Sequence, residues 1–126
     1  MKRYIGFAVV AFILIVSGFV YLSLRSDRNK QAAYRNEDDV HLAHLRAALP
    51  IGTPRIEIIE YLKNNHVEIE TFPSNLEVHG LLPVRPSTLW YCSTMQPYAD
   101  FYFSSGTPEE APLQQISIAE RGIDCL

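Results

Sequence analysis

The sequence YIGFAVVAFILIVSGFVYLSL, which begins at Tyr4 and ends at Leu24, contains no charged residue. As an α-helix with a rise of about 1.5 Å per residue, it is long enough to cross the roughly 30 Å hydrocarbon core of a bilayer. The small residues inside it, such as Gly6 and Gly18, are common in membrane helices. The stretch therefore predicts a single-pass transmembrane helix.

The alternative to an anchor is a secretory signal that is cleaved off. A signal has a basic start, which Lys2 and Arg3 supply here, but its apolar centre is only about 7–15 residues long. The present run is longer, and no A-x-A-like cleavage site ends it. We expect an uncleaved signal-anchor, with a cleaved signal as the alternative.

The orientation of the anchor is less constrained, because basic residues stand on both sides of it: Lys2 and Arg3 before, and Arg25, Arg28 and Lys30 after. A basic start followed by an apolar run is the order found in signals, and both cysteines lie in the remainder of the chain. We expect the N-terminus in the cytoplasm, the anchor in the inner membrane and the C-terminal part in the periplasm.

The charge of the C-terminal part limits its partners. All fourteen acidic residues lie beyond position 25, against eight of the eleven basic ones. A nucleic-acid-binding surface needs clustered Lys and Arg, and so does adsorption to anionic lipid. We therefore expect no nucleic-acid partner.

Cys92 and Cys125 are the only cysteines of the chain. Their spacing is not C-x-x-C, so it suggests neither a thioredoxin-like redox site nor a zinc site. A structural disulfide would stabilise a domain of fewer than a hundred residues, whose hydrophobic core is small. Two unpaired buried thiols are the alternative.

The pattern divides the chain into an anchor (residues 1–24), a polar tether (25–37) and a small α+β domain (38–126). The tether contains neither Gly nor Pro, so it either extends the membrane helix or forms a short link. The domain begins with a helix over residues 40–49, in which Leu42, Leu45 and Leu49 recur at helical spacing before Pro50 ends it.

A second short helix follows a turn at Gly52, with Thr53 as its N-cap and Pro54 at its first position. Its expected inner stripe is Ile56, Ile59 and Leu62, with Ile58 beside them, while Arg55, Glu57, Glu60 and Lys63 face water.

Strands are predicted beyond this helix. Val67, Ile69 and Thr71 alternate with glutamates, which predicts a strand exposed on one face. Further strands are expected over residues 87–95, 99–104 and 113–119, with Gln96 and Pro97 separating the first two. Residues 76–82 are a candidate for one more short strand. Phe101 and Phe103 are the expected core partners of Ile116 and Ile118. The fold class is therefore α+β: two short helices packed on an antiparallel sheet of three to four strands.

Four aromatic residues of the C-terminal third are candidates for a binding surface: Trp90, Tyr91, Tyr98 and Tyr102. They divide between the two faces of the predicted sheet, so some remain outside the core, and exposed aromatic clusters mark interaction sites. The alternative is that they fill the core or are scattered tyrosines. The loop over residues 105–112 is a further candidate contact.

No motif of a nucleophile, a metalloprotease or a phosphate-binding loop is present, so we expect no enzyme and assign no catalytic residue. His41 and His44 lie one helical turn apart, but metal sites need three or four ligands and no clear third one is evident. We expect neither a metal nor a cofactor.

The motif Leu-x-x-Gly-Thr at residues 49–53, followed by x-Ile-x-x-Tyr-Leu at residues 57–62, resembles the SmpA/OmlA type of small envelope module, which is related in shape to the β-lactamase-inhibitor-like fold. The order of elements is similar over residues 42–119. The modules that it resembles carry a lipidated cysteine, where this chain has a spanning helix. The resemblance implies a non-catalytic module that binds through surface contact.

Together these features predict a membrane-anchored periplasmic interaction or scaffold module of the bacterial envelope with a protein partner. The alternative is a membrane-tethered inhibitor or immunity protein that blocks an enzyme or toxin.

Overall fold

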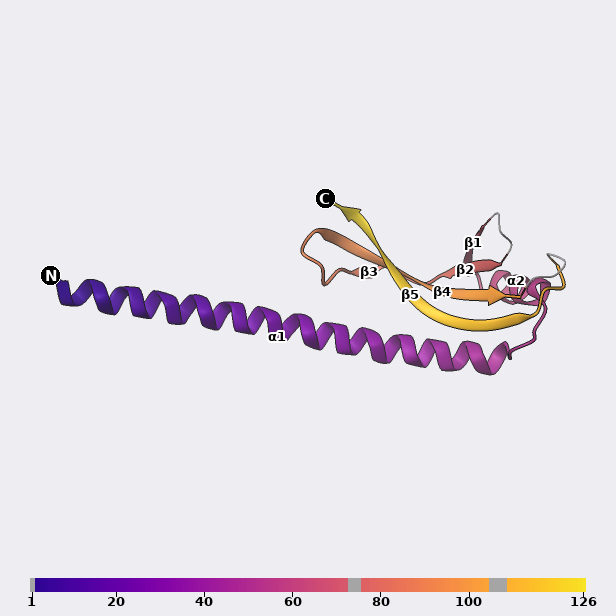
Figure 1. Ribbon diagram of the computed structural model, residues 1–126, viewed down its shortest axis with the longest axis horizontal. Coiled ribbons are helices and arrows are strands. Elements are labelled where there is room, and N and C mark those ends of the chain that lie inside the picture. Colours follow the sequence, from indigo (N-terminus) through magenta and orange to yellow (C-terminus); the bar gives the residue numbers. More distant parts are fainter. Residues whose placement is uncertain (1, 73–75, 105–108) are drawn as a thin grey trace. The chain divides into compact units, whose positions relative to one another are not determined.

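The computed structural model describes residues 2–72, 76–104 and 109–126 (Figure 1). Residue contacts divide the chain into two compact units, Met1–Arg35 and Asn36–Leu126. The first unit is helical, and the second combines helical segments with a five-stranded antiparallel sheet.

The first helix, α1 (Lys2–Ala48), contains the apolar stretch and is long and apolar enough to cross a membrane. None of its apolar window is buried by described residues. The hydroxyls of Ser17 and Ser23 donate to the carbonyls of Ile13 (2.7 Å) and Phe19 (3.0 Å), so these polar groups are satisfied inside the helix.

Residues 25–37 are helical as well, so of the two alternatives for this segment the helical extension is correct. The expected separate helix over residues 40–49 is consequently the last part of α1, because residues 25–49 contain neither Gly nor Pro.

The turn after α1 is organised around Gly52, whose φ of 92° lies in the left-handed region that favours glycine. The hydroxyl of Thr53 donates to the carbonyl of Pro50 (2.6 Å) rather than to the following helix. Helix α2 (Arg55–Asn64) has Pro54 as its N-cap, so both predicted cap positions are wrong by one residue. Backbone carbonyls of Ala111 (3.1 Å) and Glu109 (3.2 Å) instead accept from its first two N–H groups.

The buried stripe of α2 differs from the expected one. Arg55, Ile58 and Leu62 are buried, whereas Ile56 is 46% exposed. The buried positions 55, 58 and 62 follow the helical period of 3.6 residues, whereas the expected positions 56, 59 and 62 are spaced by three residues throughout. The backbone contacts at 109 and 111 fix the first turn with Arg55 inward, where its guanidinium lies 6.0 Å from the centre of the Phe103 ring. The expectation that Arg55 faces water was wrong.

The sheet contains five strands, one more than the upper expectation of four. They are β1 (Glu68–Thr71), β2 (Glu77–Leu81), β3 (Arg85–Pro86), β4 (Cys92–Phe103) and β5 (Leu113–Cys125). All pairings are antiparallel, and the long strand β4 is central: β2 and β3 share one of its edges and β5 occupies the other (Figure 1).

Strand β4 runs through Gln96 and Pro97, where the sequence predicts a break. The carbonyl of Pro97 accepts from the backbone N–H of Leu82 (2.9 Å), so the nitrogen and the carbonyl of Pro97 face the edge shared by β2 and β3. On that edge β3 pairs with residues 94–95 and β2 with residues 98–102. Leu82 lies opposite Pro97, so the proline removes the backbone hydrogen bond that the Leu82 carbonyl would otherwise accept. The side-chain amide of Gln96 donates to that carbonyl instead, and the strand continues.

The core lies between one face of this sheet and the helical segments of the second unit. Phe101 and Phe103 are fully buried, and Phe101 lies directly opposite Ile116 on β5, as expected. Leu42 and Leu45 pack against the same cluster, in which Leu49 is buried. The helices of this unit thus cover one face of the sheet and leave the other open.

Candidate functional site

The open side of the sheet, here called the outer face, carries a row of three polar residues. Glu70 on β1, His79 on β2 and Asp100 on β4 lie directly opposite one another in the strand register. Paired residues point to the same side of a sheet, so their side chains share one face. The neighbouring row, Ile69, Gly80 and Ala99, points into the core. The outer face is defined by Glu70, Glu77, His79, Tyr98, Asp100 and Tyr102.

His79 is the centre of this row. It is only 9% exposed, and its ring lies between two aromatic rings: Tyr98 stacks on it at 4.3 Å between centroids, and Phe72 meets it edge-on at 4.4 Å. These contacts fix the plane of the imidazole, so its two nitrogens have defined directions.

Three carboxylates surround the imidazole. Nε2 of His79 lies 3.6 Å from Oδ1 of Asp100 and 3.8 Å from Oε2 of Glu77, and Nδ1 lies 3.9 Å from Oε2 of Glu70. These separations exceed hydrogen-bonding distance. Accordingly, Nδ1 of His79 and Oδ1 of Asp100 are buried without a hydrogen-bond partner among the described residues.

Burial raises the pKa of the Asp100 carboxyl. The positive charge that His79 can carry opposes this shift, and the nearby charge of Glu77 adds to it. The two carboxylates thus disfavour each other's charge, which is the situation that an added cation would relieve.

Glu70 is held by a second partner. The guanidinium of Arg121 donates to both of its carboxylate oxygens, at 2.6 and 2.9 Å. These hydrogen bonds lower the pKa of Glu70 and raise that of Arg121. The guanidinium also lies 6.0 Å from the centre of the Tyr98 ring. Arg121 therefore fixes the direction in which Glu70 faces His79.

The four aromatic residues predicted as a binding surface fall into two pairs. Tyr98 and Tyr102 lie on the outer face, Tyr98 half-buried and Tyr102 exposed, whereas Trp90 and Tyr91 precede β4. At roughly 3.3 Å per residue, Tyr91 and Tyr98 are about 20 Å apart along the strand. Only the tyrosine pair lies on the outer face together with His79.

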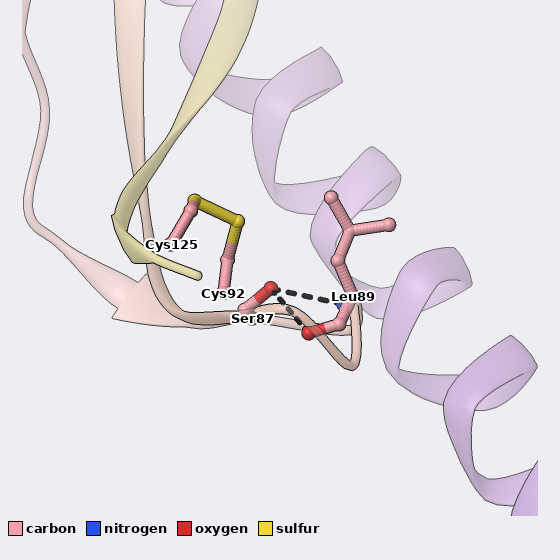
Figure 2. The surroundings of a disulfide bond; sticks show 4 residues. All are labelled: Ser87, Leu89, Cys92 and Cys125. Atoms are coloured by element: carbon pink, nitrogen blue, oxygen red, sulfur yellow. Dashed lines mark hydrogen bonds between the residues drawn. A yellow bond between two sulfur atoms is a disulfide. The ribbon is translucent and has the colours of Figure 1, made fainter.

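Trp90 and Tyr91 form an exposed turn beside the disulfide of Cys92 and Cys125, which are directly paired across β4 and β5 (Figure 2). Trp90 is 89% exposed, and its ring meets Tyr91 edge-on at 5.6 Å. The hydroxyl of Ser87 accepts from the N–H of Leu89 (2.9 Å) and stabilises the turn. The backbone N–H of Leu126 donates to the carbonyl of Tyr91 (2.8 Å).

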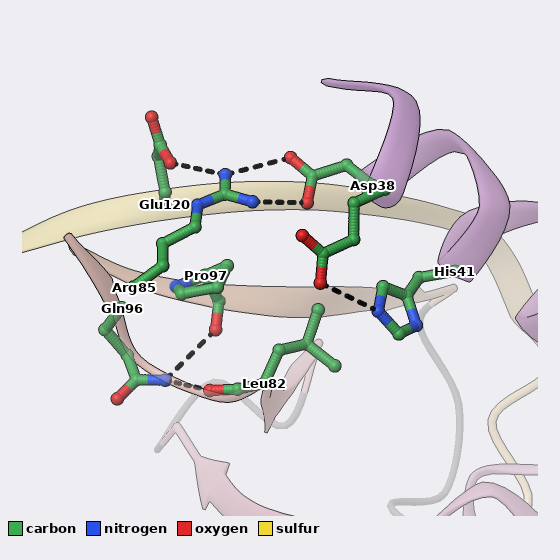
Figure 3. Close-up of polar contacts among 8 residues, drawn as sticks. Asp38, His41, Leu82, Arg85, Gln96, Pro97 and Glu120 are labelled. Carbon is green, nitrogen blue, oxygen red and sulfur yellow. Dashed lines mark hydrogen bonds and ion pairs between the residues drawn. The ribbon is translucent and has the colours of Figure 1, made fainter. Parts of the chain in front are cut away.

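A second charged group combines side chains of α1, β3 and β5. Arg85 donates to both oxygens of Asp38 (2.9 and 3.0 Å) and to Glu120 (2.6 Å), as Figure 3 shows. These carboxylates raise the pKa of Arg85. All three residues belong to the second unit. Their ion pairs connect the last part of α1 to β3 and β5. We interpret it as structural.

A cavity of about 210 Å³ lies on the helical side of the sheet. His41 and His44 line it together with Leu45, Tyr61, Leu62, Asn65, Val67, Gly80, Leu82 and Ala99. His41 is 3.7 Å from Glu37. The wall is mostly apolar, and neither histidine belongs to the group of potential metal ligands found among the described residues.

That group is Glu77, His79 and Asp100, whose ligand atoms all lie within 4.8 Å of one another. Sequence patterns did not single it out. Glu77 and His79 are two residues apart on a strand and share a face, which the sequence can indicate. Asp100 joins them only through the register of β2 and β4.

Comparison with known proteins gives no relative: no family model, no curated protein and no solved structure matches the chain. The resemblance to the SmpA/OmlA type of module stays a prediction.

Proposed function

We propose that this chain is a single-pass protein of the bacterial inner membrane whose periplasmic domain binds a protein partner through the outer face of its sheet. The domain works by contact, as an interaction or scaffold module. The proposal has three parts, which are the anchor, the compartment and the binding surface, and each has its own support.

The anchor is supported by the exposure of its side chains. Phe7, Phe12 and Phe19 are 80%, 68% and 74% exposed. So many exposed apolar side chains are unfavourable in water and favourable in the hydrocarbon of a bilayer. A helix also satisfies its backbone hydrogen bonds internally, as the bilayer requires.

The periplasm is supported by the disulfide, because disulfides persist in oxidising compartments and are rare in the cytosol. The test is labelling of Cys92 and Cys125 in intact cells with a membrane-impermeant maleimide. Labelling that appears only after reduction is the expected result. Free thiols that react only after lysis, without a reductant, would place the domain in the cytoplasm and refute this part.

The observation that carries the binding function is the composition of the outer face. No helix covers it among the described residues, and it combines Tyr98 and Tyr102 with a bidentate Arg121–Glu70 pair. Tyr and Arg are enriched at protein interfaces, where they supply much of the binding energy.

Site-specific photo-crosslinking in intact cells tests this surface. A photoreactive phenylalanine replaces Tyr102 on the outer face or, as the matched control, Glu60 on the exposed side of α2. We expect a discrete cross-linked adduct from position 102 and none from position 60. Adducts from both positions, or from neither, would refute the outer face as the contact.

The second candidate, a membrane-tethered inhibitor, is favoured by the acidic character of the same face, where Glu70, Glu77 and Asp100 gather. Such a face complements a basic partner. An inhibitor is expected to give one adduct with a single enzyme or toxin and to lower its activity when purified, whereas a scaffold leaves its partner active.

A further inference from the structure

We infer that Glu77, His79 and Asp100 form a binding site for a divalent metal ion of the zinc type, with Nε2 of His79 and one oxygen of each carboxylate as ligands. The inference does not depend on the protein partner proposed above. It rests on the geometry of the three ligand atoms, on the unsatisfied groups around them and on the arrangement behind the histidine.

The ligand atoms are close to the spacing that a metal ion requires. Two ligands of one tetrahedral zinc ion, each roughly 2.1 Å from it, are about 3.4 Å apart. Nε2 of His79 lies 3.6 Å from Asp100 and 3.8 Å from Glu77. All three ligand atoms lie within 4.8 Å of one another, so rotation of the Glu77 and Asp100 side chains has to bring them closer to complete the site.

One of the proposed ligand atoms, Oδ1 of Asp100, is buried and lacks a hydrogen-bond partner among the described residues. His79 is nine-tenths buried with its Nε2 directed between the two carboxylates. A buried polar atom without a partner is costly, and a metal ion between His79 and Asp100 would supply the partner that this oxygen lacks.

A carboxylate lies behind His79, where metal-bound histidines have a supporting one, although the separation of 3.9 Å is longer than a hydrogen bond. A ligating histidine donates its other N–H to a carboxylate, which fixes its tautomer and orientation. Here Nδ1 faces Glu70 at 3.9 Å, and Arg121 holds that carboxylate by two hydrogen bonds. Glu70 is therefore a positioning residue, and the rings of Phe72 and Tyr98 restrict the imidazole to one plane.

The donor set selects the class of ion. One imidazole and two carboxylates suit zinc and neighbouring transition metals, while calcium prefers six to eight oxygen ligands and magnesium retains an octahedral water shell. Three protein ligands also leave one tetrahedral position open to water or to a ligand from outside.

The test is zinc binding to the full chain in detergent micelles, freed of metal with a chelator and carrying no histidine tag, measured by titration calorimetry. We expect one ion per chain, and weaker binding of calcium and magnesium. Both Asp100→Asn and Glu77→Gln should weaken zinc binding by at least about 10-fold, and Glu70→Gln by roughly 10–100-fold, the usual range for such supporting carboxylates.

Two controls separate this site from incidental binding. Glu60→Gln changes an exposed carboxylate on α2, and a double alanine variant of His41 and His44 removes the histidines of the cavity; neither should alter zinc affinity. The melting temperatures of all variants in chelator show whether each one folds. Absence of zinc binding, or equal binding by wild type, Asp100→Asn and Glu77→Gln, would overturn the inference. X-ray absorption showing more than one imidazole on the zinc would also overturn it.

Discussion

The disulfide between Cys92 and Cys125 should stabilise the domain mainly by restricting its unfolded state. The two residues are already neighbours in the register of β4 and β5, so their replacement by serine leaves the folded pairing intact. The sequence separation is 33 residues. In the chain-entropy model a loop of this size contributes about 3.7 kcal/mol at 25 °C. For a domain of this length, such a loss lowers the melting temperature by roughly 15–30 °C.

Pulse proteolysis in urea measures this loss in the full chain, because it reports the folded fraction of the domain without a signal from the apolar part of α1. The double serine variant and the reduced wild type should lose the same free energy of unfolding, and reductant should not change the variant further. A loss below about 1 kcal/mol would refute the reasoning, since it would mean that the unfolded chain already holds this hairpin closed.

The other predictions concern single side chains and use the same assay. Gly122→Ala should destabilise the oxidised protein and leave the reduced one nearly unchanged, because a Cβ there would overlap both sulfur atoms of the disulfide; equal effects in both states would contradict the contact. Ile58→Ala should cost about 2–5 kcal/mol, whereas Ile56→Ala, on the exposed side of α2, should cost well under half of that. Arg85→Met should lower the free energy of unfolding by about 2–3 kcal/mol, because it leaves the carboxylates of Asp38 and Glu120 without their cation. Asp38→Asn in the same chain should restore part of this stability. Strict additivity of these last two changes would show that the pair is not coupled.

Local sequence patterns predicted which helices and strands form better than they predicted where each one begins and ends. The uncharged stretch, the turn at Gly52 and the partnership of Phe101 with Ile116 follow from length, backbone freedom and alternation. The continuation of β4 through Pro97 was missed, because it depends on the side chain of Gln96, which donates to the Leu82 carbonyl in place of the N–H that proline lacks.

The charged row of the outer face shows the same limit. Alternation within β2 places Glu77 and His79 on one side, but nothing local selects Asp100 or Glu70 as their neighbours. A shift of one residue in the register would turn Asp100 to the core side. The register is set by packing of the whole sheet, so a site made from three strands is not encoded in any one segment. Arg55 is a further example, because its burial depends on backbone contacts from residues 109 and 111.

The central position of β4 has a consequence for biogenesis. This strand pairs with three of the other four strands, yet it begins only at residue 92 of the 126 that the chain contains. A chain made from its N-terminus therefore completes β1, β2 and β3 before their common partner exists, and a two-stranded pair such as β1 and β2 is marginal in water. Products that stop short of β4 have no sheet to join and remain open to proteolysis. Only molecules synthesised through β5 also acquire the second cysteine, so the closing of the disulfide marks a complete sheet.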